Sequence, residues 1–317
     1  MKIEALILAA GKGTRMKSDD KSKVMHNIAG YPMIGFIAET VSKIADYSHF
    51  IVGHRKEEVE FFINSEFPGA SFSFQEITDG TGGAVRSAIG NMRADTTHVL
   101  ILCGDAPLIK KETLGSLVLS FTEENADMAL LTTRLEEPAH YGRIKRNKNG
   151  NIKRIVEYID ADNEERKIKE INSGVYFIKR ELLEKSISKL TNHNKKNEYY
   201  LTDIVEISYN EGNKIISVIE EDFFSLSGIN NRLELSLADA EIERRIKNEL
   251  MISGVTLISP ETIYVEKKSI IDENTTIYPF VFIGNFAVIG KNCVISPHSF
   301  VNSKIPSDTV LEPNSTK

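Results

Sequence analysis

The stretch IEALILAAGKGTRM, residues 3–16, joins an apolar strand directly to a loop with two glycines. The mostly aliphatic run from Ile3 to Ala10 is typical of a strand buried on both faces of a parallel sheet. The loop from Gly11 to Met16 exposes backbone N–H groups, and Lys12 and Arg15 add positive charge. Its spacing matches neither the three-glycine dinucleotide fingerprint nor the P-loop. A glycine-rich turn without chemical use is one interpretation; the other, which the downstream motifs favour, is a grip for nucleotide phosphates.

The composition is that of an acidic protein large enough for more than one folded unit. The chain has 317 residues, a net charge of −6 and 41% hydrophobic residues, with no long apolar run. The opening Met-Lys-Ile-Glu is not expected to be a signal peptide. We therefore expect a cytoplasmic protein that binds no nucleic acid and no membrane. Cys103 and Cys293 are the two cysteines, too few for a disulfide framework or a zinc cluster.

Strands alternate with helices through the first two thirds of the chain. The apolar spacing predicts helices over 31–45, 83–92, 201–209 and 231–250, strands over 50–52, 72–74, 98–103, 127–135 and 174–178, and a hairpin over 144–156. Asn149-Gly150 suits a type I′ turn in that hairpin. The strand over 98–103 delivers Asp105 at its carboxyl end, where ligands bind in open α/β sheets. Gly11 and Asp105 are therefore expected at one edge of the sheet.

The last part of the chain has a different period. Aliphatic residues return every six positions, at Ile271, Ile277, Ile283, Ile289, Ile295 and Val301. This period predicts a parallel β-helix of hexapeptide repeats, with about two coils. So few coils need cover from the preceding helix or from partner subunits, which favours a trimer or another small homo-oligomer.

A series of motifs in fixed order resembles the sugar nucleotidyltransferases, most of all the bacterial N-acetylglucosamine-1-phosphate uridylyltransferases. After the opening loop, the likeness covers residues 1 to about 250 through Lys23-Val24-Met25-His26, Gly80-Thr81-Gly82, Gly104-Asp105-Ala106-Pro107-Leu108, Tyr141-Gly142-Arg143, Ile155-Val156-Glu157, Glu170-Ile171-Asn172-Ser173-Gly174, Glu198-Tyr199-Tyr200-Leu201-Thr202-Asp203 and Gly228-Ile229-Asn230-Asn231-Arg232. Two positions depart from the family pattern. Ser22 stands where the family usually has proline, and Thr78 where it usually has a glutamine that reads the base.

The resemblance implies an α/β fold in three parts. Residues 1–228 would form a Rossmann-like nucleotidyltransferase domain with a mixed, mainly parallel sheet. Residues 229–253 would form a connector helix, and residues 254–317 a short left-handed parallel β-helix.

The activity that the resemblance implies is formation of UDP-N-acetylglucosamine and pyrophosphate from UTP and N-acetylglucosamine 1-phosphate, with Mg²⁺. The sugar phosphate is already an anionic nucleophile, so its in-line attack on the α-phosphorus needs positioning and charge neutralisation but no covalent intermediate. Asp105 at a strand end is the best candidate for a magnesium ligand. The resemblance adds Asn230 as the second protein ligand, and it makes Arg15 and Lys23, with Asp105, the catalytic set.

The resemblance also assigns the residues that bind the substrates. They are Leu8, Ala9, Ala10, Gly11, Gly13, Lys23, Thr78, Gly80, Thr81, Cys103, Gly104, Asp105, Gly142, Glu157, Asn172 and Asn230. Gly142, Glu157 and Asn172 would surround the sugar, and Gly80 and Thr81 the junction with the nucleotide. Backbone groups or Gln75 can also read the base, but Thr78 offers only a short hydroxyl. We therefore expect UTP to remain preferred, with weaker discrimination against other pyrimidine triphosphates than the family pattern would give.

Three alternatives remain beside this function. Another hexose 1-phosphate or nucleoside triphosphate would keep the reaction class. An acetyltransferase is suggested by the repeats, but we expect it to be absent, because its site in bifunctional family members lies in a longer β-helix than these residues form. A non-catalytic sugar-nucleotide binder would be expected to lack Asp105, Lys23 or Arg15, and all three are present.

Overall fold

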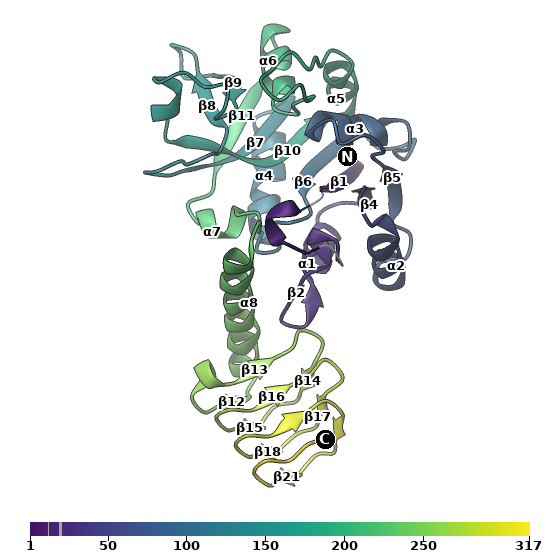
Figure 1. Cartoon of the computed structure of the whole chain (residues 1–317), viewed down its shortest axis with the longest axis vertical. Coiled ribbons are helices and arrows are strands. Elements are labelled where there is room, and N and C mark those ends of the chain that lie inside the picture. The colour runs from purple at the N-terminus through teal and green to yellow at the C-terminus, as the bar shows by residue number, and fades with distance from the viewer. Residues whose placement is uncertain (12, 19–20) are drawn as a thin grey trace. The chain divides into compact units, whose positions relative to one another are not determined.

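The computed structural model of the chain describes residues 1–11, 13–18 and 21–317 (Figure 1). Lys12, whose charge was expected in the phosphate loop, lies outside the described residues. The chain divides into two compact units, one of residues 1–25 and 34–228 and the other of residues 26–33 and 229–317.

The first unit is built on one mixed sheet. Within the described part of the chain, its nine strands are β1 (Ile3–Ala9), β4 (Tyr47–Val52), β5 (Ser71–Phe74), β6 (His98–Cys103), β7 (Met128–Arg134), β8 (Arg143–Arg146), β9 (Ile152–Val156), β10 (Glu170–Lys179) and β11 (Ile215–Ile219). The main order is β11-β7-β10-β6-β1-β4-β5, with the hairpin β8–β9 joined to β10. Strand β10 runs antiparallel to β6 and β7, whereas β5, β4, β1 and β6 are parallel neighbours. This confirms the predicted mixed, mainly parallel sheet.

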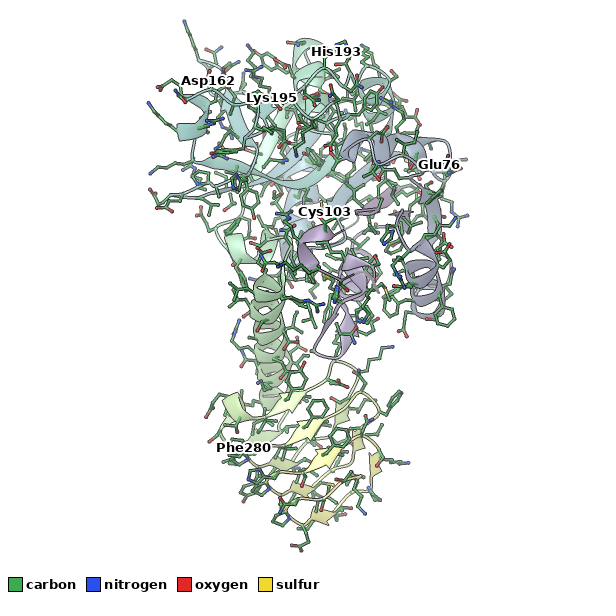
Figure 2. The ribbon with its side chains drawn as sticks, viewed as in Figure 1. Glu76, Cys103, Asp162, His193, Lys195 and Phe280 are labelled. Atoms are coloured by element: carbon green, nitrogen blue, oxygen red, sulfur yellow. The ribbon has the colours of Figure 1, made fainter. Side chains whose placement is uncertain are left out.

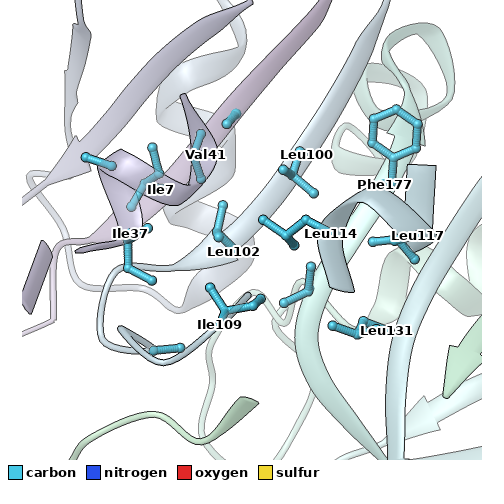
Figure 3. Close-up of a cluster of buried hydrophobic side chains, with 14 of the residues drawn as sticks. Ile7, Ile37, Val41, Leu100, Leu102, Ile109, Leu114, Leu117, Leu131 and Phe177 are labelled. Carbon is cyan, nitrogen blue, oxygen red and sulfur yellow. The ribbon is translucent and has the colours of Figure 1, made fainter. Parts of the chain in front are cut away.

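Helices cover both faces of this sheet. They are α1 (Met33–Val41), α2 (Lys56–Glu66), α3 (Thr81–Ile89), α4 (Lys111–Glu123), α5 (Arg180–Ile187), α6 (Asp203–Asn210) and α7 (Phe223–Leu226), with 3-10 turns η1 (Thr14–Met16), η2 (Lys23–Met25) and η3 (Glu165–Lys167). Side chains of α1, α2 and α4 pack on one face, where Ile37, Leu114, Leu102 and Phe177 share a buried cluster (Figure 3). Side chains of α3, α5 and α6 pack on the other face. The alternation of side chains along the strands thus gives two cores, one on each side of the sheet.

The helix predicted over 31–45 begins later than expected. Residues Tyr31–Pro32 form β3, which pairs with β2 (Asn27–Ile28), and α1 begins at Met33. This hairpin belongs to the second unit, where Asn285 Nδ2 donates to the Gly30 carbonyl at 2.9 Å. Pairing of residues 31 and 32 with residues 28 and 27 replaces the helical conformation that the local spacing predicts.

The second unit contains α8 (Arg232–Ile252) and a parallel β-helix. The strands are β12 (Thr256–Leu257), β13 (Tyr264–Val265), β14 (Ile270–Ile271), β15 (Thr276–Ile277), β16 (Phe282–Ile283), β17 (Val288–Ile289), β18 (Val294–Ile295), β19 (Phe300–Val301), β20 (Lys304–Ile305) and β21 (Val310–Leu311), with a 3-10 turn η4 (Pro260–Thr262). They form three parallel sheets, β12-β15-β18-β21, β13-β16-β19 and β14-β17-β20. The six residues that carry the sequence repeat are all at most 7% exposed.

The expected two coils were too few. In the described residues three full coils form and β21 begins a fourth. The hexapeptide period misses the outer coils because it is broken on both sides: η4 lies between Leu257 and Val265, and only four positions separate Val301 from Ile305. Ile246 and Leu250 of α8 pack against the β-helix core, so the helix supplies part of the expected cover. Across the described residues, no helix has the length and apolar composition to cross a membrane.

Candidate active site

The glycine loop and Asp105 lie at the same edge of the sheet. Strands β1 and β6 are parallel neighbours in which Leu8 is level with Cys103, and the Gly104 N–H donates to the Leu8 carbonyl at 2.9 Å. Strands β1 and β6 end close to these positions, so Gly11 and Asp105 follow the carboxyl ends of adjacent strands. Gly11 is exposed, and a Cβ built on it meets nothing within 4 Å. The backbone there is open to a ligand.

Gly13 is required by the geometry of the loop. Its φ is +61°, and a Cβ on it would lie 2.6 Å from the Cβ of Lys23. Both the left-handed backbone and the close approach exclude a side chain. Thr14 and Arg15 follow in η1 with exposed side chains. The loop thus presents a cation and backbone groups at its surface, as phosphate binding demands.

Lys23 and Asp105 form an ion pair at this edge. The Lys23 ammonium donates to Asp105 Oδ2, and the two side chains are 12% and 23% exposed. A Cβ on Gly228 would lie 3.0 Å from Asp105 Oδ1, so the glycine keeps the side of the carboxylate clear. Nearby, the backbone N–H of Ser22 donates to Glu58 Oε2 at 3.2 Å, a bond that the family's usual proline cannot make.

The described residues contain no group of three or more His, Cys, Asp or Glu side chains arranged to hold a metal. A site with one carboxylate suits Mg²⁺, which takes one or two protein oxygens and completes its shell with waters and substrate phosphates. Asn230, the other expected ligand, belongs to the second unit, where its N–H donates to Glu234 Oε2 at 2.6 Å. Its place beside Asp105 stays a prediction.

Cys103 ends β6 beside this site, at the position labelled in Figure 2. Burial and the neighbouring Asp105 raise the pKa of its thiol to about 12. The thiolate is therefore inaccessible near neutral pH, and Cys103 cannot act as a nucleophile. A Cβ on Gly174 would lie 3.7 Å from its sulfur.

Gly80 and Thr81 start α3 and are tied to the segment 198–203. Gly80 has φ +103°, and a Cβ on it would lie 2.6 Å from the Tyr199 carbonyl. The same carbonyl accepts from the Gly82 N–H at 2.8 Å, and the Leu201 N–H donates to Thr81 Oγ1 at 3.2 Å. The motif at 198–203 therefore fixes the amino end of α3.

Of the two side chains expected near the base, Thr78 is exposed, whereas the amide of Gln75 already makes hydrogen bonds within the protein. Thr78 is exposed in the loop before α3. Gln75 is only 8% exposed, and its amide donates to Asp79 Oδ1 and to the Gly80 carbonyl, both at 3.0 Å. Its N–H donors are thus committed to shaping the loop, which leaves the Oε1 acceptor.

The three residues expected around the sugar form one row across the hairpin. Arg143 is level with Val156 of β9 and with Ile171 of β10, so the adjacent row contains Gly142, Glu157 and Asn172. The Asn172 N–H donates to the Gly142 carbonyl at 2.9 Å. A Cβ on Gly142 would lie 3.7 Å from Glu157 Oε1 and 3.8 Å from the Asn172 Cβ. The same Cβ would lie 2.9 Å from Ile155 Cγ2, so the close packing beside Glu157 and Asn172 requires glycine at this position.

Both polar side chains of this row, Glu157 and Asn172, form hydrogen bonds with neighbouring residues. Thr202 Oγ1 donates to Glu157 Oε1 at 3.1 Å, while burial raises the pKa of Glu157. Asn172 donates from Nδ2 to the Tyr176 hydroxyl at 2.8 Å. Burial, with the carboxylates of Glu206 and Glu157, raises the pKa of Asp203 to about 6. Thr202 and Asp203 were part of a recognised motif but had no expected role; only the fold reveals that this motif backs the row.

Comparison with known proteins agrees with both units. The nucleotidyl transferase family profile matches residues 4–228, and the profile of bacterial transferase hexapeptide repeats matches residues 268–303. The bifunctional protein GlmU of Geobacter metallireducens is 39% identical over 92% of this chain and 61% of its own length. The bifunctional protein GlmU of Caldicellulosiruptor saccharolyticus is 42% identical over 97% of this chain and 70% of its own length.

Among solved structures, UDP-glucose pyrophosphorylase in complex with UDP-glucose shares the fold. Its TM-score is 0.60 at 18% identity, and the match covers 77% of this chain and all of that one. The profile match spans the entire sheet with the glycine loop, Asp105 and the Gly142 row, and the chain therefore belongs to the nucleotidyl transferase family.

Proposed function

We propose that the chain forms UDP-N-acetylglucosamine and pyrophosphate from UTP and N-acetylglucosamine 1-phosphate, in the cytoplasm and with Mg²⁺. The observation that carries this proposal is the convergence of the open glycine loop with the Lys23–Asp105 pair at one sheet edge. The identity of 39% to a GlmU protein supports the choice of substrates.

The described residues supply what phosphoryl transfer requires. Backbone groups of the Gly11 loop and the Arg15 guanidinium face solvent at the edge where a triphosphate would bind. Lys23 neutralises phosphate charge from a position fixed by Gly13. No side chain needs to remove a proton, because the sugar phosphate is already ionised. Catalysis by these residues is positioning and charge compensation.

The donor set fits a divalent metal. Asp105 offers a carboxylate oxygen whose side is kept clear by Gly228, and Asn230 follows two residues later in the sequence. When bound there, Mg²⁺ would neutralise charge on the phosphates of both substrates. We propose Asp105 and Asn230 as its protein ligands.

The Gly142 row is the proposed sugar subsite. A carboxylate acceptor and an amide side by side suit the hydroxyl groups of a hexose, since each would lose a partner if the hydroxyl were missing. Another hexose 1-phosphate or another pyrimidine triphosphate remains the second candidate, favoured by the exposed Thr78 at the base-reading position.

We also propose that copies of this chain associate through the β-helix, as a trimer or another small homo-oligomer. Its surface carries exposed apolar side chains, among them Phe280 at 60% and Phe286 at 77%. Large apolar side chains left exposed along a repeat segment favour a protein partner. Light scattering at micromolar concentration tests the state, and a monomer would contradict it.

The enzymatic proposal is tested by a grid of nucleoside triphosphates against sugar 1-phosphates, with pyrophosphate release measured in Mg²⁺. We expect the highest kcat/KM for UTP with N-acetylglucosamine 1-phosphate. A different best pair would replace the substrates, and no release with any pair would refute the activity.

A further inference from the structure

Arg143 carries a full charge although only 2% of its surface is exposed. Its guanidinium donates to backbone carbonyls: Nη1 to Tyr141 and, at 3.4 Å, to Pro138; Nη2 to Ala139 at 2.9 Å; Nε to Arg166 at 3.4 Å. Burial lowers the pKa of Arg143, and its guanidinium lies 5.5 Å from the centre of the Tyr158 ring. Burying a cation is costly unless its donors are used, and here several carbonyls use them.

Three of these carbonyls belong to the loop that leads into Gly142. Ala139 in this loop has φ +43°, a left-handed conformation that is unfavourable for a residue with a Cβ. The bond from Arg143 Nη2 holds the carbonyl of this same residue. Aromatic contacts also hold the loop: His140 packs edge-on against Tyr158, and Tyr141 packs edge-on against Phe223. The loop therefore keeps a strained shape through contacts to Arg143 and to rings.

The side chain of Arg143 acts from behind the sugar row. Successive side chains on a strand point to opposite faces, so Arg143 in β8 points away from the face that Gly142 shares with Glu157 and Asn172. Its bond to the Tyr141 carbonyl reaches the peptide that joins Tyr141 to Gly142. Fixing this peptide fixes the direction of the Gly142 N–H.

We propose that Arg143 is a positioning residue for the sugar 1-phosphate: by gathering the carbonyls of residues 138, 139, 141 and 166, it sets the backbone of Gly142 that the sugar meets. This inference rests on the proposed function, because it takes the Gly142 row as the sugar subsite. Arg143 touches no substrate in this account. Lysine cannot replace it, since one ammonium cannot span carbonyls spread around a planar fork.

The test is Arg143→Lys in the full chain, with Arg146→Lys as the matched control. Arg146 lies on the same strand, donates to Glu170 with two nitrogens and is partly exposed. We expect Arg143→Lys to raise the KM for N-acetylglucosamine 1-phosphate about tenfold, the size of a slight misplacement, while the KM for UTP changes less than about twofold. Amide exchange of a peptide over 137–143 should be faster in the free variant. Arg146→Lys should show neither effect.

An unchanged KM for the sugar phosphate, or an equal rise in both KM values, would overturn the positioning role. If Arg143→Lys does not fold, Tyr158→Leu keeps the guanidinium but removes its ring contact, and it should raise the same KM by a smaller factor. An unchanged value there would also overturn the role. The wild type separates this inference from the proposed function: an inactive wild type refutes the function, whereas an active wild type with a silent variant refutes only the role of Arg143.

Discussion

The two ends of the parallel strands β1, β4, β5 and β6 treat polar groups in opposite ways. Glu4 near the amino end of β1 and His49 midway along β4 are fully buried, and Ser73, which lies level with Ile51 farther along β5, is 4% exposed. At the carboxyl side, Gly11, Thr14 and Arg15 are exposed. The same strands therefore carry a closed polar cluster that extends inward from the amino end and an open one at the carboxyl end.

The closed cluster is internally satisfied. Asn91 donates to Ser73 Oγ at 2.8 Å, Ser73 lies 2.8 Å from His49 Nε2, and His49 Nδ1 lies 3.1 Å from Glu4 Oε1. Glu4 Oε2 accepts from Thr96 Oγ1 and from the Arg93 N–H. A Ser-His-Glu series suggests a hydrolase, but burial and full satisfaction make this one a structural network. The lesson is that exposure, more than residue type, marks the functional end.

The largest effect should come from the open end. Asp105→Asn keeps the shape of the side chain but removes its charge, so we expect turnover to fall at least about 100-fold with an unchanged melting temperature. Pyrophosphate release at saturating Mg²⁺ measures the loss. Asp272→Asn, an exposed position in the second unit, is the matched control and should be silent. Near wild-type turnover of Asp105→Asn would remove this residue from the mechanism.

A substitution in the closed cluster should lower stability rather than activity. Glu4→Gln turns an amide N–H₂ toward groups that already donate, and we expect the free energy of unfolding to fall by about 2–3 kcal/mol. Urea unfolding measures this change, and both KM values should stay as in the wild type. A variant that kept its stability but lost turnover would reverse the comparison between the two ends.

Lowering the pH should reduce the difference in the free energy of unfolding between Glu4→Gln and the wild type. Burial opposes the charge of Glu4, but the hydrogen bonds from His49, Thr96 and Arg93 outweigh it and lower its pKa. A lowered pKa stabilises the fold above the unfolded value of about 4.3, and this contribution disappears as the pH falls through the folded pKa. Urea midpoints between pH 7 and pH 3 should therefore converge. Parallel curves would show that the pKa of Glu4 is the same in the folded and unfolded states.

The smallest effect concerns the base. Thr78→Gln restores an amide at an exposed position of the open end, and we expect the preference for UTP over CTP to rise by about tenfold or less. Ratios of kcat/KM for the two triphosphates measure it. If the wild type already excludes CTP and the variant changes nothing, position 78 does not read the base.

Much of the fold could be predicted from local pattern, and the exceptions have physical causes. Apolar runs revealed β1 and β6, and the hexapeptide period revealed the inner coils, because burial repeats at the spacing of the backbone. The turn at Asn149-Gly150 differs: only Gly150 has a positive φ, and Asn147 Oδ1 accepts from the N–H groups of 149 and 151. The side chain of Asn147 thus replaces the predicted type I′ turn with a longer loop.

The site was accessible to sequence reasoning where it depends on strand ends and motifs. Gly11 and Asp105 could be placed together from topology alone. The roles of Arg143 and Thr202 could not, because they arise from pairing between β8, β9 and β10 and from the approach of the segment 198–203. The Thr202–Glu157 contact joins positions 45 residues apart, and Arg143 binds main-chain carbonyls rather than side chains, so no local period reports either role.

The most direct test of the account is amide exchange of the full chain with and without UDP-N-acetylglucosamine and Mg²⁺. We predict slower exchange in peptides over 8–16, 78–83 and 137–143 at the open end, and unchanged exchange over 90–97, the loop that borders the closed cluster. Protection over 90–97, or none at the open end, would contradict the assignment of function to the carboxyl edge of the sheet.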